Sequence, residues 1–130
     1  MRVWFLAAGL TAALTAQAFA ANDARFFKSL EKLAPADRLE QLCDYTAMTE
    51  IRKDKRGFRP ERAVANAGGE TKIKDHSIQS TNGAFRSKKK WYAMTYSCTA
   101  TPDHLKVVSF KVTIGDEIPT ARWAALGLYN

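Results

Sequence analysis

Two cysteines are the residues in this sequence most suited to covalent chemistry. Cys43 and Cys98 are the only cysteines in the chain. A zinc or redox site would need a CxxC pair or neighbouring histidines, and the sequence has neither. In an oxidising compartment two cysteines can form only one disulfide. The alternative is that both are buried free thiols. We predict a structural disulfide that closes a loop of about 55 residues.

Two histidines are the next candidates, and each follows an aspartate, as Asp75-His76 and Asp103-His104. Adjacent residues on a strand point to opposite faces, so neither pair forms a ready acid–base couple. A metal site would need a third or fourth ligand, and no spaced pattern supplies one. Because GxSxG, HExxH and glycine-rich phosphate motifs are also missing from the sequence, we expect no catalytic residue, no metal ligand and no cofactor, and favour a non-enzymatic protein.

Cations beside a tryptophan form a third candidate site. An indole ring next to ammonium and hydroxyl groups can stack on a sugar and bind an anion. The alternative is a solvated sheet face with a lysine-rich turn that confers solubility. The residues are Arg86, Lys88, Lys89, Lys90, Trp91 and Lys111. A second basic cluster follows the second predicted helix, where cations stabilise a helix C-terminus; it comprises Arg52, Lys53, Lys55, Arg56, Arg59 and Arg62.

Helices are predicted in the first half of the mature chain. Asn22 can cap a helix with an apolar stripe that includes Phe26 and Leu30. Pro35 ends that helix and opens a second one, from about Ala36 to Lys53, which directs Cys43 to the core. Residues 54–70 are expected to be mainly loop, with one short helix after Pro60 at most.

Strands are predicted in the second half, at residues 71–79, 90–100 and 105–114, with a turn at Asn82-Gly83. A three-residue loop at 102–104 would set Cys98 opposite Val108 and unite the apolar faces. Trp91 and Lys111 would then lie on the open face. A short helix at 120–126, ended by Gly127, would complete an α+β fold with N-terminal helices packed on a small antiparallel sheet.

The first twenty residues are typical of a secretory signal peptide. Arg2 is followed by an apolar run over residues 3–16 and by the small-x-small pattern Ala18-Phe19-Ala20. The run is shorter than the roughly 20 apolar residues that span a bilayer. No later segment is apolar enough to insert. We expect cleavage after residue 20, a single soluble domain over residues 21–130, and a periplasmic or secreted location.

Charge narrows the choice of partner. The chain carries 20 Lys and Arg against 13 Asp and Glu, a formal net charge of +7, which favours anionic partners. Export makes cellular nucleic acid an unsuitable target. We expect an anionic glycolipid, a cell-wall polymer or an acidic protein to bind. The alternatives are a small hydrolase or transferase that acts on envelope material, and an inhibitor or immunity protein.

Several blocks of the sequence resemble a known family. They are RLEQLCD (38–44), Ala47-Met48, KWYAMTYSC (90–98), PDHLKVVSF (102–110), IGDEIP (114–119), Trp123 and Gly127-Leu128-Tyr129. Together they resemble the bacterial domain-of-unknown-function family nine-thirty, made of small exported proteins. The resemblance implies an envelope or secreted location and two cysteines placed as here. It implies no functional residue, because the family has no assigned activity, and the run Lys88-Lys89-Lys90 is more basic than its pattern.

Overall fold

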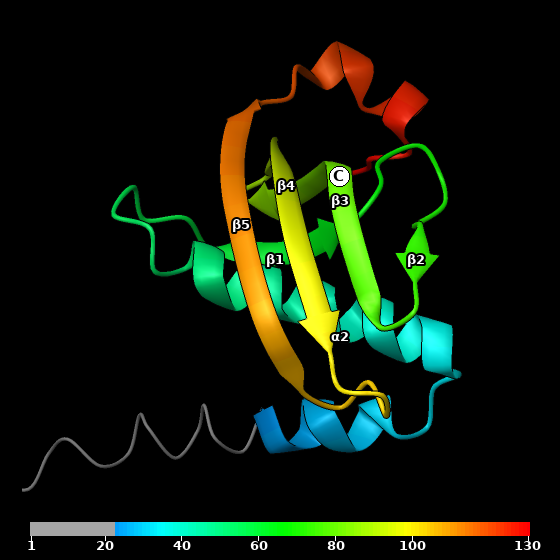
Figure 1. The fold of residues 1–130 in the computed structure, drawn as a ribbon. Helices are drawn as coiled ribbons and strands as arrows, with labels where there is room; N and C mark the ends of the chain where they lie inside the picture. Colours follow the sequence, from blue (N-terminus) through cyan, green and yellow to red (C-terminus); the bar gives the residue numbers. More distant parts are fainter. Residues whose placement is uncertain (1–22) are drawn as a thin grey trace, which may run out of the picture.

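The computed structural model describes residues 23–130, and the predicted signal peptide and the Asn22 cap lie outside them. Within this part the chain folds as two helices and a five-stranded antiparallel sheet (Figure 1). The α+β prediction is therefore confirmed. Neither helix in this part is long and apolar enough to cross a membrane.

The helices follow their apolar spacing. Residues 23–30 are helical, and α2 spans Pro35–Ile51, with Pro35 in its first turn, where the missing amide proton costs nothing. Five apolar side chains of α2 are buried against the sheet: Leu39, Leu42, Cys43, Ala47 and Ile51. The predicted second helix is thus confirmed, ending two residues early.

The strands are β1 (Pro60–Val64), β2 (Ile73–Lys74), β3 (Ser77–Ser87), β4 (Lys90–Ala100) and β5 (Val107–Glu117). Their order is β1-β3-β4-β5, with β2 paired to β3 outside this path. β4 has the predicted bounds. Residues 54–59 and 65–70 are loop, as expected. The prediction of a short helix after Pro60 was wrong, because Pro60 instead begins an edge strand, a position that tolerates a missing backbone donor.

The turn predicted at Asn82-Gly83 was also wrong. These residues lie inside β3, where a register shift separates Ser80 from Gly83. A Cβ on Gly83 would lie 2.6 Å from Ser80 Oγ, so any side chain at this position would force its neighbours to move. The β3–β4 turn is formed by Lys88 (φ 49°) and Lys89 (φ 67°), although the two-residue turns that need positive φ at both positions usually contain Asn and Gly.

From Met94 to Thr99 the register of β4 against β5 differs from the prediction by two residues. Cys98 lies opposite Phe110, and Tyr96 opposite Val112. A shift of two leaves these side chains on their predicted faces, because the side-chain period of a strand is two. Beyond a bulge the shift is larger, with Tyr92 opposite Glu117. The connecting loop is longer than expected, with Thr101 N donating to Lys106 O at 2.8 Å.

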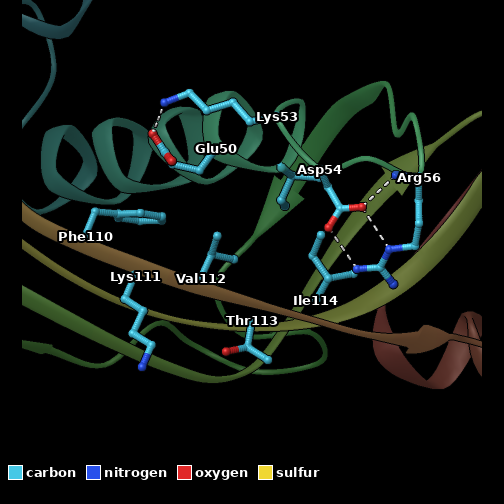
Figure 2. Close-up of a pocket in the computed structure, with 10 residues that line it drawn as sticks. Glu50, Lys53, Asp54, Arg56, Phe110, Lys111, Val112, Thr113 and Ile114 are labelled. Atoms are coloured by element: carbon cyan, nitrogen blue, oxygen red, sulfur yellow. Dashed lines mark hydrogen bonds and ion pairs between the residues drawn. The ribbon is translucent and has the colours of Figure 1, made fainter.

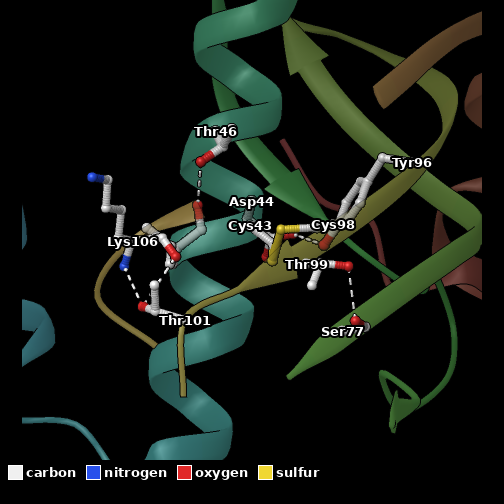
Figure 3. Close-up of a disulfide and its surroundings, with 10 residues drawn as sticks. Cys43, Asp44, Thr46, Ser77, Tyr96, Cys98, Thr99, Thr101 and Lys106 are labelled. Atoms are coloured by element: carbon white, nitrogen blue, oxygen red, sulfur yellow. Dashed lines mark hydrogen bonds between the residues drawn. A yellow bond between two sulfur atoms is a disulfide. The ribbon is translucent and has the colours of Figure 1, made fainter. Parts of the chain in front are cut away.

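The main core lies between α2 and the sheet and contains the predicted disulfide (Figure 3). Cys43 of α2 is bonded to Cys98 of β4, with their Cα atoms 6.0 Å apart and both residues buried. The prediction of a structural bridge is confirmed. The disulfide joins the helix layer to the centre of the sheet.

A second, smaller core lies at one end of the sheet, on the face turned away from α2. After β5 the chain forms two 3-10 turns, η1 (Thr120–Arg122) and η2 (Ala124–Leu126), where one short helix was expected. Gly127 then adopts a left-handed conformation, as predicted. We call residues 118–128 the C-terminal flap, which covers the sheet end in Figure 1. Its buried residues are Ile118, Trp123 and Leu128, packed with Trp91, Ala84 and Ala67.

Candidate functional site

We expected Trp91 to lie on an open surface, but it is buried. It is 3% exposed, beneath the C-terminal flap. Its Nε1 donates a hydrogen bond to the carbonyl oxygen of Tyr129 at 3.0 Å. The predicted strand face was right, but the chain after β5 folds back over that face. Trp91 is therefore a core residue and does not form an exposed binding platform.

Of the cations predicted beside Trp91, Lys111 lies apart from the four at or next to the β3–β4 turn. Arg86, with a side chain 13% exposed, faces Glu61 at 3.3 Å, and Lys90 faces Glu117 at 3.6 Å. Lys88 and Lys89 are exposed at the turn. Lys111 is opposite Ser97, six residues along β5 from Glu117, which corresponds to roughly 20 Å at about 3.3 Å per residue.

Two residues of the second basic cluster, Lys53 and Arg56, border a groove at the edge of the sheet. The groove has a volume of about 530 Å³ and lies between β5 and the segment from the end of α2 to Arg56. Figure 2 shows Phe110, Val112 and Ile114 on the side of β5 that faces this segment, while Lys111 and Thr113 point to the other side. The three apolar side chains are only half-buried. β5 pairs with β4 alone, so its outer edge has no neighbouring strand in the described part of the chain.

Two ion pairs form the rim of the groove. Lys53 Nζ lies 2.8 Å from Glu50 Oε1, and Arg56 holds both carboxylate oxygens of Asp54 at 2.9 and 3.0 Å (Figure 2). The hydrogen bonds from the Arg56 side chain and backbone lower the pKa of Asp54 to about 2. At neutral pH the rim therefore consists of charged groups above an apolar floor.

A second hollow, of about 420 Å³, lies between α2 and β1 at the other side of the molecule. Asp44 lines it, 7% exposed, and accepts a hydrogen bond from Tyr96 Oη at 2.9 Å (Figure 3). Burial raises the pKa of Asp44 to about 7, and burial also raises the pKa of Tyr96. The sequence contains no signal for this pair, because Asp44 is simply one polar residue within a helix.

The two histidines, for which we expected neither a catalytic nor a metal-binding role, lie close together. His76 Nδ1 lies 3.0 Å from His104 Nε2. The pairing of the first residues of β3 with the end of β4 brings them together, since Ala100 N donates to His76 O at 2.9 Å. The repeated Asp-His dipeptide was the only signal in the sequence. No group of three or more His, Cys, Asp or Glu side chains that could hold a metal occurs within residues 23–130.

Comparison with known proteins gives one match. Neither the curated proteins nor the solved structures contain a significant match to the chain. The profile of the Domain of Unknown Function family DUF930 matches residues 30–128, from the end of the first helix to the C-terminal flap. This range contains both cysteines, all five strands and every residue that lines the groove beside β5. The chain therefore belongs to the DUF930 family.

Proposed function

We propose that this domain is an exported, non-enzymatic binding protein that takes an extended, acidic segment of a partner protein onto the free edge of β5. The observation that carries the proposal is the row Phe110, Val112 and Ile114, half-buried along an edge strand without a neighbour in the described part of the chain. Export rests on the signal pattern of residues 1–20, and the buried disulfide is consistent with it.

The free edge of β5 offers two kinds of contact to such a segment. A strand at a sheet edge presents unpaired backbone amide and carbonyl groups, which an added strand can bind. Every second side chain of the added strand would then point into the groove beside Val112. The groove of about 530 Å³ has room for these side chains.

Charge supports an acidic partner over a second copy of this chain. The side chains of the added strand that do not enter the groove would lie on the face of Lys111. The chain has a formal net charge of +7, so two copies repel each other, whereas an acidic segment is attracted. Arg86 and Lys90 each face a carboxylate, and Lys111 lies far along β5 from the β3–β4 turn. These positions give less support to one anionic glycolipid or cell-wall polymer bound across the sheet.

A defined peptide tests the proposal. A labelled peptide of four Glu-Val repeats is apolar on one face and acidic on the other when it is extended. We expect it to bind the disulfide-intact domain, measured by fluorescence polarisation, and to slow hydrogen exchange at backbone amides of β5. Val112→Lys should abolish binding, because it places a charge in the groove. Val108→Lys adds the same charge to the same strand at a position 68% exposed and outside the groove, and should bind normally.

An all-glutamate peptide of equal length separates charge from strand addition. It should bind at least tenfold more weakly than the Glu-Val peptide. Equal binding of both peptides would instead favour an anionic polymer as the natural partner and refute the edge-strand proposal. An equal loss of peptide binding in the Val112 and Val108 variants would also refute it. Circular dichroism tests whether both variants are folded.

A further inference from the structure

The histidine pair lies at the end of α2 opposite to the β5 groove and is independent of the proposed function. His104 is 6% exposed and His76 is exposed. These are the only two histidines in the chain. We propose that His76 Nδ1 and His104 Nε2 form a binding site for a divalent transition-metal ion of the zinc class, completed by water.

The hydrogen bonds of His104 fix its protonation in the form that a metal requires. Its Nδ1 lies 2.6 Å from the carbonyl oxygen of Pro35. A carbonyl can only accept, so Nδ1 carries the proton and Nε2 has a free lone pair. Metal-binding histidines almost always donate their second ring nitrogen in this way to a backbone carbonyl or a carboxylate.

The separation of the two nitrogens also suits a metal. Tetrahedral zinc with ligand nitrogens at about 2.0–2.1 Å holds two of them roughly 3.3 Å apart. His76 Nδ1 and His104 Nε2 are 3.0 Å apart. Zinc binding therefore requires the exposed His76 ring to move by a few tenths of an ångström and to turn, so that both lone pairs point at the metal. The proton on His76 Nδ1 would move to its own Nε2, and the metal would take its place between the rings.

The backbone holds His104 in a constrained position. Its φ is 57°, in the left-handed region, which a residue with a side chain occupies at a cost. Its own amide donates to Thr101 O at 2.8 Å, which closes the loop around it. A buried ligand whose ring and backbone are both held loses little freedom on binding a metal.

The charges around the pair are mixed. The carboxylates of Asp75 and Asp103 each adjoin a histidine in sequence. Arg38 opposes them, since its Nη1 donates to Asp103 O at 2.8 Å. With only two protein ligands, the remaining coordination positions stay open to water or to a group from another molecule.

Zinc alone is the probe for the test. The disulfide-intact domain, made without a histidine tag, should bind one zinc ion per chain in equilibrium dialysis. By NMR the nitrogen resonances of His76 Nδ1 and His104 Nε2 should shift, while that of His104 Nδ1 stays near its original position. His76→Ala should lose the zinc, and Lys74→Ala, an exposed change two residues away, should retain it.

Three results would overturn the inference. They are a wild-type domain that stays free of zinc after dialysis against an excess, equal binding by wild type and His76→Ala, and bound zinc that shifts neither ring. Because His76 is exposed, its replacement is not expected to unfold the domain. Melting curves of both variants, recorded without zinc, test that directly.

Discussion

Asp44 should make the domain less stable as the pH rises, which is unusual for a carboxylate. Burial raises the pKa of Asp44 in the folded state to about 7 from an ordinary value of 3.8. Between these values the folded state keeps a proton that the unfolded state has released. The stability linked to Asp44 is therefore complete below about pH 4, falls through the window up to pH 7, and is absent above it.

The size of the effect follows from the two pKa values. At about 1.4 kcal/mol per pH unit, the change from 3.8 to about 7 corresponds to about 4 kcal/mol. Asp44→Asn keeps an oxygen that can accept from Tyr96 but carries no charge. It should raise the free energy of unfolding by up to about 4 kcal/mol at pH 8 and change it little at pH 4.

Urea denaturation of wild type and Asp44→Asn at pH 4, 6 and 8, with the disulfide intact, measures this difference. Asp54→Asn is the control with the opposite sign. Arg56 lowers the pKa of Asp54 to about 2, so its contribution is present at neutral pH and lost as the pH falls from about 4 towards 2. A difference between wild type and Asp44→Asn that does not change with pH would show that Asp44 is charged at little cost in the folded state, contrary to our reasoning.

Three further predictions concern stability. Reduction of Cys43–Cys98, which are 55 residues apart, should lower the free energy of unfolding by about 4 kcal/mol on the chain-entropy model; alkylation of both thiols without prior reductant would contradict the disulfide. Replacing Lys88-Lys89 by Asn-Gly should raise the urea midpoint by the equivalent of about 1–2 kcal/mol, because both residues have positive φ, and an unchanged midpoint would argue against a strained turn. Gly83→Ala should cost about 1–3 kcal/mol, because its Cβ would meet Ser80 Oγ and the Met94 carbonyl; a Tm equal to that of wild type would mean that β3 adjusts freely.

Features set by local spacing could be predicted from the sequence. The apolar period of α2 and the proline in its first turn determine where it lies and which way Cys43 points. Alternation along β4 determines that Cys98 points to the same layer. Two independent periods therefore place both sulfurs in one layer, which is why the disulfide was predictable.

Features set by distant segments could not be predicted. Alternation put Trp91 on the correct face of β4 but cannot reveal that the C-terminal flap covers that end of the sheet. Face matching cannot distinguish registers two residues apart, since both keep the same faces. Asn82-Gly83 has the strongest local turn preference in the sequence, yet both residues lie within β3. Asn82 Nδ2 donates to Ala67 O at 2.9 Å, and a prediction from neighbouring residues alone does not include a contact between residues 15 positions apart.

The groove and the histidine pair depend on strand order. Nothing in the composition of β5 shows that it has one neighbour instead of two. His76 and His104 are 28 residues apart in sequence and meet only because the end of β4 returns to the beginning of β3. Both candidate sites are therefore products of tertiary pairing.

The division into two cores determines what intrinsic fluorescence can report. Trp91 and Trp123 are the tryptophans of residues 23–130, and both belong to the second core. The disulfide and α2 belong to the first. Transient opening of residues 118–128 alone would expose both indoles while the helix layer stays crosslinked to the sheet. A fluorescence transition that precedes the loss of far-ultraviolet circular dichroism would identify this segment as a separate cooperative unit.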